Sequence, residues 1–266
     1  MDSRAGEKLR ALFSSAGGVH SIFGPKVADY VASRPDYPAA LLAELQRRCP
    51  TPGRVVDVGA GTGLLTQGLL RVGYDVVAVE PNADMRRACD HLLGGLPTYR
   101  SFAGSAESIP LPDHSVQLVT AAQAFHWFDL ERSRRECRRV LTADGLVALI
   151  WNERLATDPL QRALDAVLGR FGGEKWQLLG IQEQRAGVEQ FFGAHPESLT
   201  WPHAHALDRE GLRALVFSRS YIPARDTPAG ADVTAAVDEV FDRFCDAGQN
   251  SVQVRYETIL LIGRIA

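Results

Sequence analysis

Short apolar runs alternate with amphipathic stretches between residues 38 and 151. Near-continuous runs rich in valine are typical of strands buried on both faces, whereas apolar residues recurring every three or four positions are typical of helices. We therefore expect strands at residues 54–58, 75–80, 98–103, 116–122 and 146–151, and helices at residues 38–49, from 64 onward, 83–93 and 130–141. This alternation predicts an α/β fold with an open, mostly parallel, doubly wound sheet.

The pattern is looser after residue 151. Helices are expected at residues 159–171, 208–217 and 231–246, the second of them begun by an Asp208 cap, and a strand is expected at 197–206. Residues 251–262 alternate and then become wholly apolar, which predicts a closing, antiparallel strand. No repeat or low-complexity segment interrupts the chain, so we expect one domain over residues 1–266.

The first strand ends in the sequence Asp57-Val58-Gly59-Ala60-Gly61-Thr62-Gly63. Glycine lacks a Cβ, so such a loop lets a ligand approach the backbone, whose N–H groups we expect to point outward toward an anionic group. Glu80 ends the next strand, about 20 residues after the first glycine, the separation at which a carboxylate accepts hydrogen bonds from ribose hydroxyls. Together these residues predict an adenosine-containing ligand.

Dinucleotide dehydrogenases place glycines in the related pattern G-x-G-x-x-G. Their third glycine would fall at Leu64, whereas this chain has it one position earlier, at Gly63. The spacing disfavours a pyrophosphate site, and a tight turn that binds nothing is the remaining structural alternative.

The sequence Asp-Val-Gly-Ala-Gly-Thr-Gly resembles the first motif of class I S-adenosylmethionine-dependent methyltransferases, which have a Rossmann-like fold. Residues 104–110 resemble the loop after the third strand of that family, and residues 115–129 and 30–38 are similar to segments of small-molecule members related to trans-aconitate methyltransferase. Thr142-Ala143-Asp144 departs from the usual Lys-Pro-Gly turn before the fifth strand, which puts the subfamily in doubt more than the activity. The resemblance covers residues 30–151, and no later motif is as specific.

The resemblance implies S-adenosylmethionine as cofactor and S-adenosylhomocysteine as product. The cofactor site that it implies consists of Tyr30, Arg34, Asp57, Gly59, Ala60, Gly61, Gly63, Glu80, Pro81, Met85, Ser105, Ala106, Glu107 and Gln123. Ser105 and Ala106 would border the adenine, and Arg34 would pair with the methionine carboxylate. A solvated arginine on a packing helix is the alternative for Arg34, and an exposed surface carboxylate is the alternative for Glu107.

Methyl transfer needs an aligned donor and acceptor more than it needs catalytic side chains. His126 is the candidate general base, because an imidazole can accept a proton near neutral pH, and simple packing beside Trp127 is the alternative. Position suggests six substrate contacts: Phe125, Trp127, Trp151, Asn152, Arg219 and Tyr221. Arg219 would suit an acidic substrate, and an ordinary surface arginine is the alternative for it. Within the single domain, residues 30–151 would bind the cofactor, 152–250 would cover the substrate, and 251–262 would close the sheet.

The composition of the chain limits the kinds of binding partner that we expect. A net charge of −3 gives no general attraction for nucleic acid or anionic lipid, and acidic residues interrupt the basic run of Arg132, Arg134, Arg135, Arg138 and Arg139. The four cysteines form no C-x-x-C pair, and His195, His203 and His205 do not suffice to predict a metal site. With no signal peptide or membrane-length apolar run, we expect a cytoplasmic enzyme, monomeric or homodimeric, that acts on a small molecule without nucleic-acid or membrane partners.

Two functional alternatives stay open at this stage. One is a protein that binds or senses S-adenosylmethionine without catalysis, because no indispensable catalytic residue is visible. The other is a methyltransferase that acts on RNA or protein.

Overall fold

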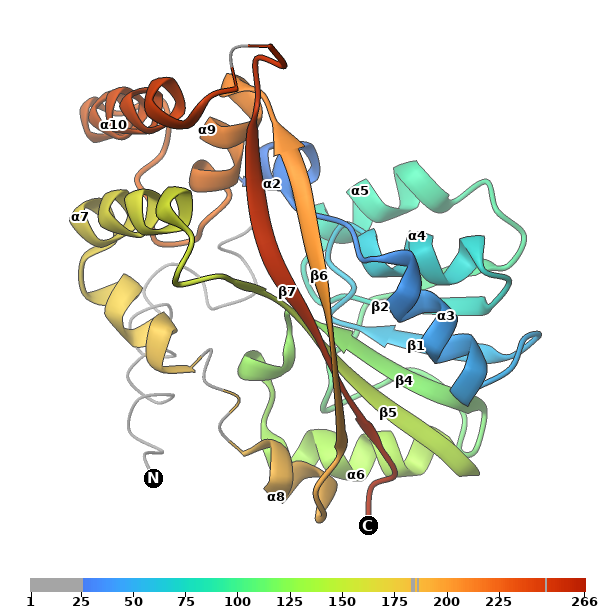
Figure 1. Ribbon diagram of the computed structural model, residues 1–266. Coiled ribbons are helices and arrows are strands. Elements are labelled where there is room, and N and C mark those ends of the chain that lie inside the picture. The colour runs from blue at the N-terminus through green and yellow to red at the C-terminus, as the bar shows by residue number, and fades with distance from the viewer. Residues whose placement is uncertain (1–25, 183–184, 186, 247) are drawn as a thin grey trace. The chain divides into compact units, whose positions relative to one another are not determined.

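The computed structural model describes residues 26–182, 185, 187–246 and 248–266 (Figure 1). Its strands are β1 (Arg54–Val58), β2 (Asp75–Val79), β3 (Tyr99–Phe102), β4 (Val116–Ala122), β5 (Leu141–Arg154), β6 (Glu197–Leu207) and β7 (Val252–Gly263). Its helices are α2 (Val27–Ser33), α3 (Ala39–Arg48), α4 (Leu64–Arg71), α5 (Ala83–Leu93), α6 (Leu130–Val140), α7 (Pro159–Gln182), α8 (Val188–Phe192), α9 (Arg209–Phe217) and α10 (Pro228–Phe244), with a 3₁₀ helix η3 (Phe125–Trp127).

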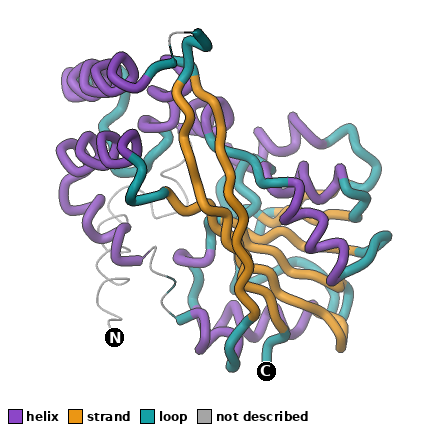
Figure 2. Tube along the Cα trace, viewed as in Figure 1, coloured by secondary structure: helices purple, strands orange, loops and turns teal. Residues whose placement is uncertain are grey.

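The strands form one sheet in the order β3-β2-β1-β4-β5-β7-β6, drawn in orange in Figure 2. The pairs β1–β2, β1–β4, β2–β3 and β4–β5 are parallel, and β7 is antiparallel. The strand order reverses between β1 and β4, and at such a switch point open α/β sheets leave a crevice outside the carboxyl ends of their strands. The predicted open, mostly parallel sheet with an antiparallel closing strand is confirmed.

Alternate residues of the parallel strands bury their side chains on opposite faces of the sheet. Val55, Val76 and Leu118 share one cluster with buried leucines of α3 and α4. Their neighbours Val56 and Val77 lie in a second cluster, with apolar residues of α6 and α8. Both faces are therefore covered, which explains why the strand sequences read as continuous apolar runs.

Most predicted element boundaries agree with the structure within a few residues, and the Asp208 cap is confirmed because its side chain accepts a hydrogen bond from the Gly211 N–H. The expected start of the fifth strand at Leu146 is wrong, since β5 already pairs Leu141 with Val116. A register shift then pairs Leu118 with Leu146, so the irregular Thr142-Ala143-Asp144 stretch lies within the strand.

Three segments differ more strongly from the expectation. The helix expected at 159–171 continues to residue 182 across a break at Gly173, whose φ is 56°. Two short helices, α2 and α8, lie where the sequence predicted none. Helices of only 7 and 5 residues present too few turns for a periodic pattern to be recognised.

The described residues divide into two compact units. The sheet unit comprises residues 36–153, 185–203 and 257–266, and the helical unit comprises those described within 1–35, 154–184 and 204–256. In the helical unit α9 packs against α2 and α10, and α10 also packs against α7. The single domain expected over residues 1–266, with its core and covering segments, stays a prediction.

Candidate functional site

Three glycines shape the loop between β1 and α4. Gly59, Gly61 and Gly63 have φ angles of 68°, 58° and 90°, a region that other residues rarely adopt. A Cβ at Gly59 would lie 2.6 Å from the Cβ of Ala124. Among the described residues, a Cβ at Gly61 would meet a single atom within 4 Å, the Met85 sulfur at 3.8 Å. The loop therefore packs closely at its start and leaves its centre open to approach.

The hydrogen-bond donors of this loop are largely used within the protein. The N–H groups of Gly59 and Ala60 donate to the Val79 carbonyl at 2.8 and 3.3 Å, and the Gly61 N–H donates to the Glu80 carboxylate at 2.9 Å. The expectation that the loop points its N–H groups outward toward an anionic group is therefore wrong for these residues. The strand-to-helix turn is instead tied to the end of β2.

Glu80 lies directly after β2 and is buried, with 7% of its surface exposed. One carboxylate oxygen accepts from the Gly61 N–H, and the other accepts from the Asn82 N–H at 2.8 Å. These two backbone hydrogen bonds fix the Glu80 carboxylate beside the loop.

Asp57 lies in β1 directly before the loop and is buried. Its oxygens accept from the Thr66 and Thr120 hydroxyls at 2.7 and 2.8 Å. Burial raises the pKa of Asp57 to about 6, and these hydrogen bonds act in the opposite direction. Its contacts are with α4 and β4, so it supports the loop from beneath; its predicted contact with the cofactor stays a prediction.

Pro81 and Met85 flank the start of α5. Asn82 caps this helix, since its side chain accepts from the N–H groups of Asp84 and Met85 at 3.0 and 2.9 Å. Met85 is buried and Pro81 is partly exposed. Both residues belong to the segment that follows Glu80, as the sequence predicted, and Asn82 fixes its course.

The loop after β3 holds Ser105, Ala106 and Glu107. Ser105 forms an antiparallel bridge with Ser108, and Ala106 is buried in the core. The Glu107 carboxylate accepts from the Asp129 N–H at 2.8 Å, which ties this loop to the start of α6. A structural contact therefore accounts for Glu107, and its predicted cofactor contact is untested.

Gln123 directly follows β4 and has a left-handed conformation, with φ 56°. Its N–H donates to the Ile150 carbonyl at 2.9 Å, and its side-chain amide donates to the Asn152 carbonyl at 3.0 Å. Strained non-glycine backbone of this kind is held in place by its surroundings and is concentrated at functional sites. The Asn152 side chain donates to the Asp36 carbonyl at 3.0 Å and accepts from the Thr258 hydroxyl at 2.6 Å.

The aromatic segment after β4 divides between core and surface. Phe125 and Trp151 are buried, and their ring centroids are 6.2 Å apart. The ring centroids of Phe125 and Phe191 are 5.1 Å apart. Core packing accounts for both side chains, so their role as substrate contacts stays a prediction without structural support. His126 and Trp127 are partly exposed on η3, with rings 4.7 Å apart.

Tyr30, Arg34, Arg219 and Tyr221 all lie in the helical unit. Arg34 follows α2 and lies over the Tyr30 ring, with its guanidinium carbon 4.8 Å from the ring centroid. Arg219 and Tyr221 are among the groups that act electrostatically on Arg34. Their predicted association with the glycine loop stays a prediction.

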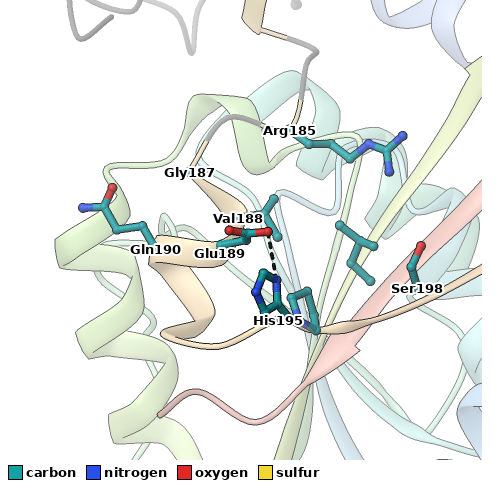
Figure 3. A pocket seen from close by; sticks show the side chains of 9 residues that line it. Arg185, Gly187, Val188, Glu189, Gln190, His195 and Ser198 are labelled. Atoms are coloured by element: carbon teal, nitrogen blue, oxygen red, sulfur yellow. Dashed lines mark ion pairs between the residues drawn. The ribbon is translucent and has the colours of Figure 1, made fainter. Parts of the chain in front are cut away.

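A hollow of about 510 Å³ lies elsewhere in the sheet unit, around α8 and the start of β6 (Figure 3). His195 and Glu189 form an exposed ion pair at its wall, 2.9 Å apart (Figure 3). Its lining consists of Arg185, Gly187, Val188, Glu189, Gln190, His195, Pro196, Ser198 and Leu261. None of the predicted site residues lines this hollow.

Other surface features have ordinary structural accounts. Arg134 and Arg138 donate to the Ala266 carbonyl at 2.6 and 3.1 Å, and Arg139 pairs with Glu136. Within the described ranges no group of three histidine, cysteine or acidic side chains could hold a metal ion. No helix in the part of the chain described here is both long and apolar enough to cross a bilayer.

Several residues at the site were not identified from the sequence. Thr66 and Thr120 support Asp57, and only the pairing of β1 with β4 brings Thr120 to it. Thr62 lies in the glycine loop with its hydroxyl buried and without a hydrogen-bond partner among the described residues. The Asn82 cap was detectable, since an asparagine directly before a helical pattern is a start signal.

Comparisons with known proteins identify the family. A profile described as a methyltransferase domain matches residues 56–149. An uncharacterized methyltransferase of Mycobacterium tuberculosis (strain ATCC 25618 / H37Rv) is 37% identical over 199 residues, which cover 75% of this chain and 76% of that protein. An uncharacterized methyltransferase-like protein of Schizosaccharomyces pombe (strain 972 / ATCC 24843) is 31% identical over 242 residues, covering 89% and 93%.

A solved structure from Anaeromyxobacter dehalogenans, assigned to the type II methyltransferases, superimposes with a TM-score of 0.62 and 26% identity, covering 87% of this chain and 98% of that one. These matches favour a catalyst over a non-catalytic binding protein and exclude the dehydrogenase alternative. The chain belongs to the class I S-adenosylmethionine-dependent methyltransferases, enzymes with a Rossmann-like fold that use S-adenosylmethionine as cosubstrate.

Proposed function

We propose that the enzyme transfers the methyl group of S-adenosylmethionine to a small-molecule acceptor, and that the cosubstrate binds at the loop formed by residues 59–63. The observation that carries this assignment is the position of the Glu80 carboxylate, which the Gly61 and Asn82 N–H groups hold beside the loop at the end of β2, the place from which a carboxylate accepts hydrogen bonds from ribose hydroxyls. The Thr62 hydroxyl, which has no hydrogen-bond partner among the described residues, and the open approach to Gly61 also suit a polar ligand at the loop.

Each predicted cofactor residue of the sheet unit has a role in this proposal. Gly59, Ala60, Gly61 and Gly63 hold the loop conformation, and Asp57 supports it from β1. Pro81 and Met85 wall the site after Glu80. Ser105, Ala106 and Glu107 border the adenine, and Gln123 fixes the end of β4. Bound S-adenosylmethionine supplies a sulfonium-linked methyl group, which passes to the acceptor as the carbon–sulfur bond breaks.

The protein has two further tasks, which are to align the acceptor and to exclude water. His126 is the proposed proton acceptor when the acceptor group is a hydroxyl or an amine, because its imidazole is partly exposed beside Trp127. In the His126→Ala variant turnover of such an acceptor would fall while S-adenosylhomocysteine still binds. Undiminished turnover in this variant would exclude His126 as the general base.

A small molecule is favoured over RNA as the acceptor. The basic helix α6 uses several arginines in contacts within the protein, including Arg134, Arg138 and Arg139. A single-stranded nucleic acid would require a free basic groove with stacking aromatic side chains. The overall charge of −3 does not supply the attraction that such a partner needs.

Calorimetric titration with S-adenosylhomocysteine tests the assignment of Glu80. The Glu80→Gln variant keeps the shape of the side chain and removes its charge, so we expect affinity to fall by about 10- to 100-fold, as for the loss of a charge-assisted hydrogen bond. Asp144→Asn is the matched control, because that carboxylate is exposed and pairs with Arg264 on the surface. Equal affinity in both variants would remove Glu80 from the cofactor site.

A further inference from the structure

Each hydrogen-bonding group of Glu80 is held by a neighbouring part of the sheet unit. Its N–H donates to the Phe102 carbonyl at 3.2 Å, and its carboxylate oxygens accept from the Gly61 and Asn82 N–H groups. Its own carbonyl accepts from the Arg86 guanidinium, with 2.8 Å between Nη1 and the oxygen. Three of these four contacts are made by backbone groups, and Arg86 supplies the fourth from its side chain.

The Glu80 carbonyl lies beyond the end of its strand. β2 ends at Val79, and Glu80 itself is buried. A buried peptide oxygen is costly to leave without a hydrogen bond, so this carbonyl requires a donor from another part of the chain. The Arg86 guanidinium supplies a charge-assisted hydrogen bond, which is stronger than one from a neutral donor.

The start of α5 places Arg86 for this contact. The Arg86 N–H donates to the Asn82 carbonyl at 3.0 Å, and the Asn82 side chain caps the helix. The Asn82 N–H in turn holds one oxygen of the Glu80 carboxylate, and the Gly61 N–H of the glycine loop holds the other. The helix start, the guanidinium and the loop therefore form one connected frame around Glu80.

The next residue of the helix is also an arginine and makes a different kind of contact. Arg87 is exposed and pairs with Asp84 on the surface of α5. Such exposed ion pairs contribute little to stability. Arg86 is less exposed and reaches back to the residue that follows β2. Of the two arginines, Arg86 is therefore the one that contacts the residue proposed to bind the cosubstrate.

We propose that Arg86 is a positioning residue of the cosubstrate site, which holds the Glu80 backbone so that the carboxylate stays aligned with the ribose hydroxyls. The inference rests on the proposed methyltransferase function and adds a residue that the family resemblance did not assign. Hydrogen bonds are directional, and a carboxylate that is fixed before the ligand arrives loses less conformational freedom on binding. Arg86 thus acts through Glu80 and does not need to touch the ligand.

Calorimetry with S-adenosylhomocysteine and its 2′-deoxy analogue tests the proposal. The ratio of the two affinities measures the hydrogen bonding of the 2′-hydroxyl, whereas a general loss of stability lowers both affinities and leaves their ratio unchanged. We expect the wild-type protein to prefer S-adenosylhomocysteine about tenfold or more, as for a hydrogen bond to a charged group. In Arg86→Met, which removes the donor and keeps an aliphatic side chain, this preference should fall severalfold. An unchanged preference would overturn the proposal.

Arg87→Met is the matched control, because it removes the adjacent guanidinium from the surface of the same helix. We expect this variant to keep the wild-type preference. An equal fall in both variants would mean that the loss of positive charge, and not the contact of Arg86 with Glu80, weakens ribose binding. That result would also overturn the proposal.

A double variant tests whether Arg86 acts through Glu80. Glu80→Ala removes the carboxylate, so adding Arg86→Met to it should not change the preference further. Losses that add independently would contradict the proposed route through Glu80. Failure of S-adenosylhomocysteine to bind the wild-type protein would instead refute the proposed function. Equal binding of both nucleosides by the wild-type protein would overturn the inference and leave S-adenosylhomocysteine as a ligand.

Discussion

Asp57 shows how the protein holds an ionisable side chain inside its sheet. Two threonine hydroxyls satisfy its oxygens, and no cation is among the described groups that chiefly set its pKa. Burial therefore dominates, and the carboxyl holds its proton to a higher pH than in the unfolded chain. Its protonation is thus linked to the stability of the fold.

The pKa of Asp57 rises from 3.8 to about 6 on folding. Between these values the folded protein binds a proton that the unfolded chain has released, so this residue's contribution to stability falls as pH rises from about 4 to about 6 and then levels off. Asp57→Asn should lack this contribution. Urea unfolding across that range should show the variant gaining stability relative to wild type as pH rises, whereas parallel profiles would contradict the pKa shift.

At the scale of elements, the glycine loop fixes the junction of β1, α4 and α5. Gly63 is the residue before α4, in a left-handed conformation, and it lies against Cys89 and Leu93 of α5. Asn82 begins α5 with two side-chain hydrogen bonds. The start of α4 thus depends on the conformation of Gly63, and the start of α5 depends on the Asn82 cap. Because Gly63 lies against α5, the loop conformation also depends on how α5 is placed.

Gly63→Ala should destabilise the protein by about 1–3 kcal/mol or more, the usual cost of a side chain at positive φ. The added Cβ would also lie 2.6 Å from the Cys89 sulfur. Gly95→Ala is the matched control, because a Cβ at Gly95 would meet no atom of the described residues within 4 Å. The free energy of unfolding in urea measures both changes, and equal effects would argue against a special role for Gly63.

For the molecule as a whole, the fold and the relatives agree on the cosubstrate. A ligand that binds only the folded state stabilises it, by about 2.7 kcal/mol at 100 times its dissociation constant. S-adenosylhomocysteine should therefore raise the melting temperature in a concentration-dependent manner. NAD should not, because the third glycine of this loop is one position too early for the dinucleotide pattern. A larger rise in melting temperature with NAD than with S-adenosylhomocysteine would contradict the assignment of S-adenosylmethionine as cosubstrate.

The sequence alone was sufficient to predict the features that depend on short stretches of chain. Continuous apolar runs gave the parallel strands because both faces of the sheet are covered, and the spacing of the glycines indicated the ligand class because φ and close approach are local properties. Glu80 could be recognised for the same reason, since one strand and one helix separate it from the loop.

Only the tertiary structure decided which side chains meet. Phe125 and Trp151 look like pocket residues in the sequence, yet they pack in the core, where the Phe125 ring contacts both Trp151 and Phe191 of α8. Thr120 reaches Asp57 through strand pairing, and Arg34 reaches Ser218 where α2 packs against α9. These two contacts join residues that are 63 and 184 positions apart, and no local pattern encodes them.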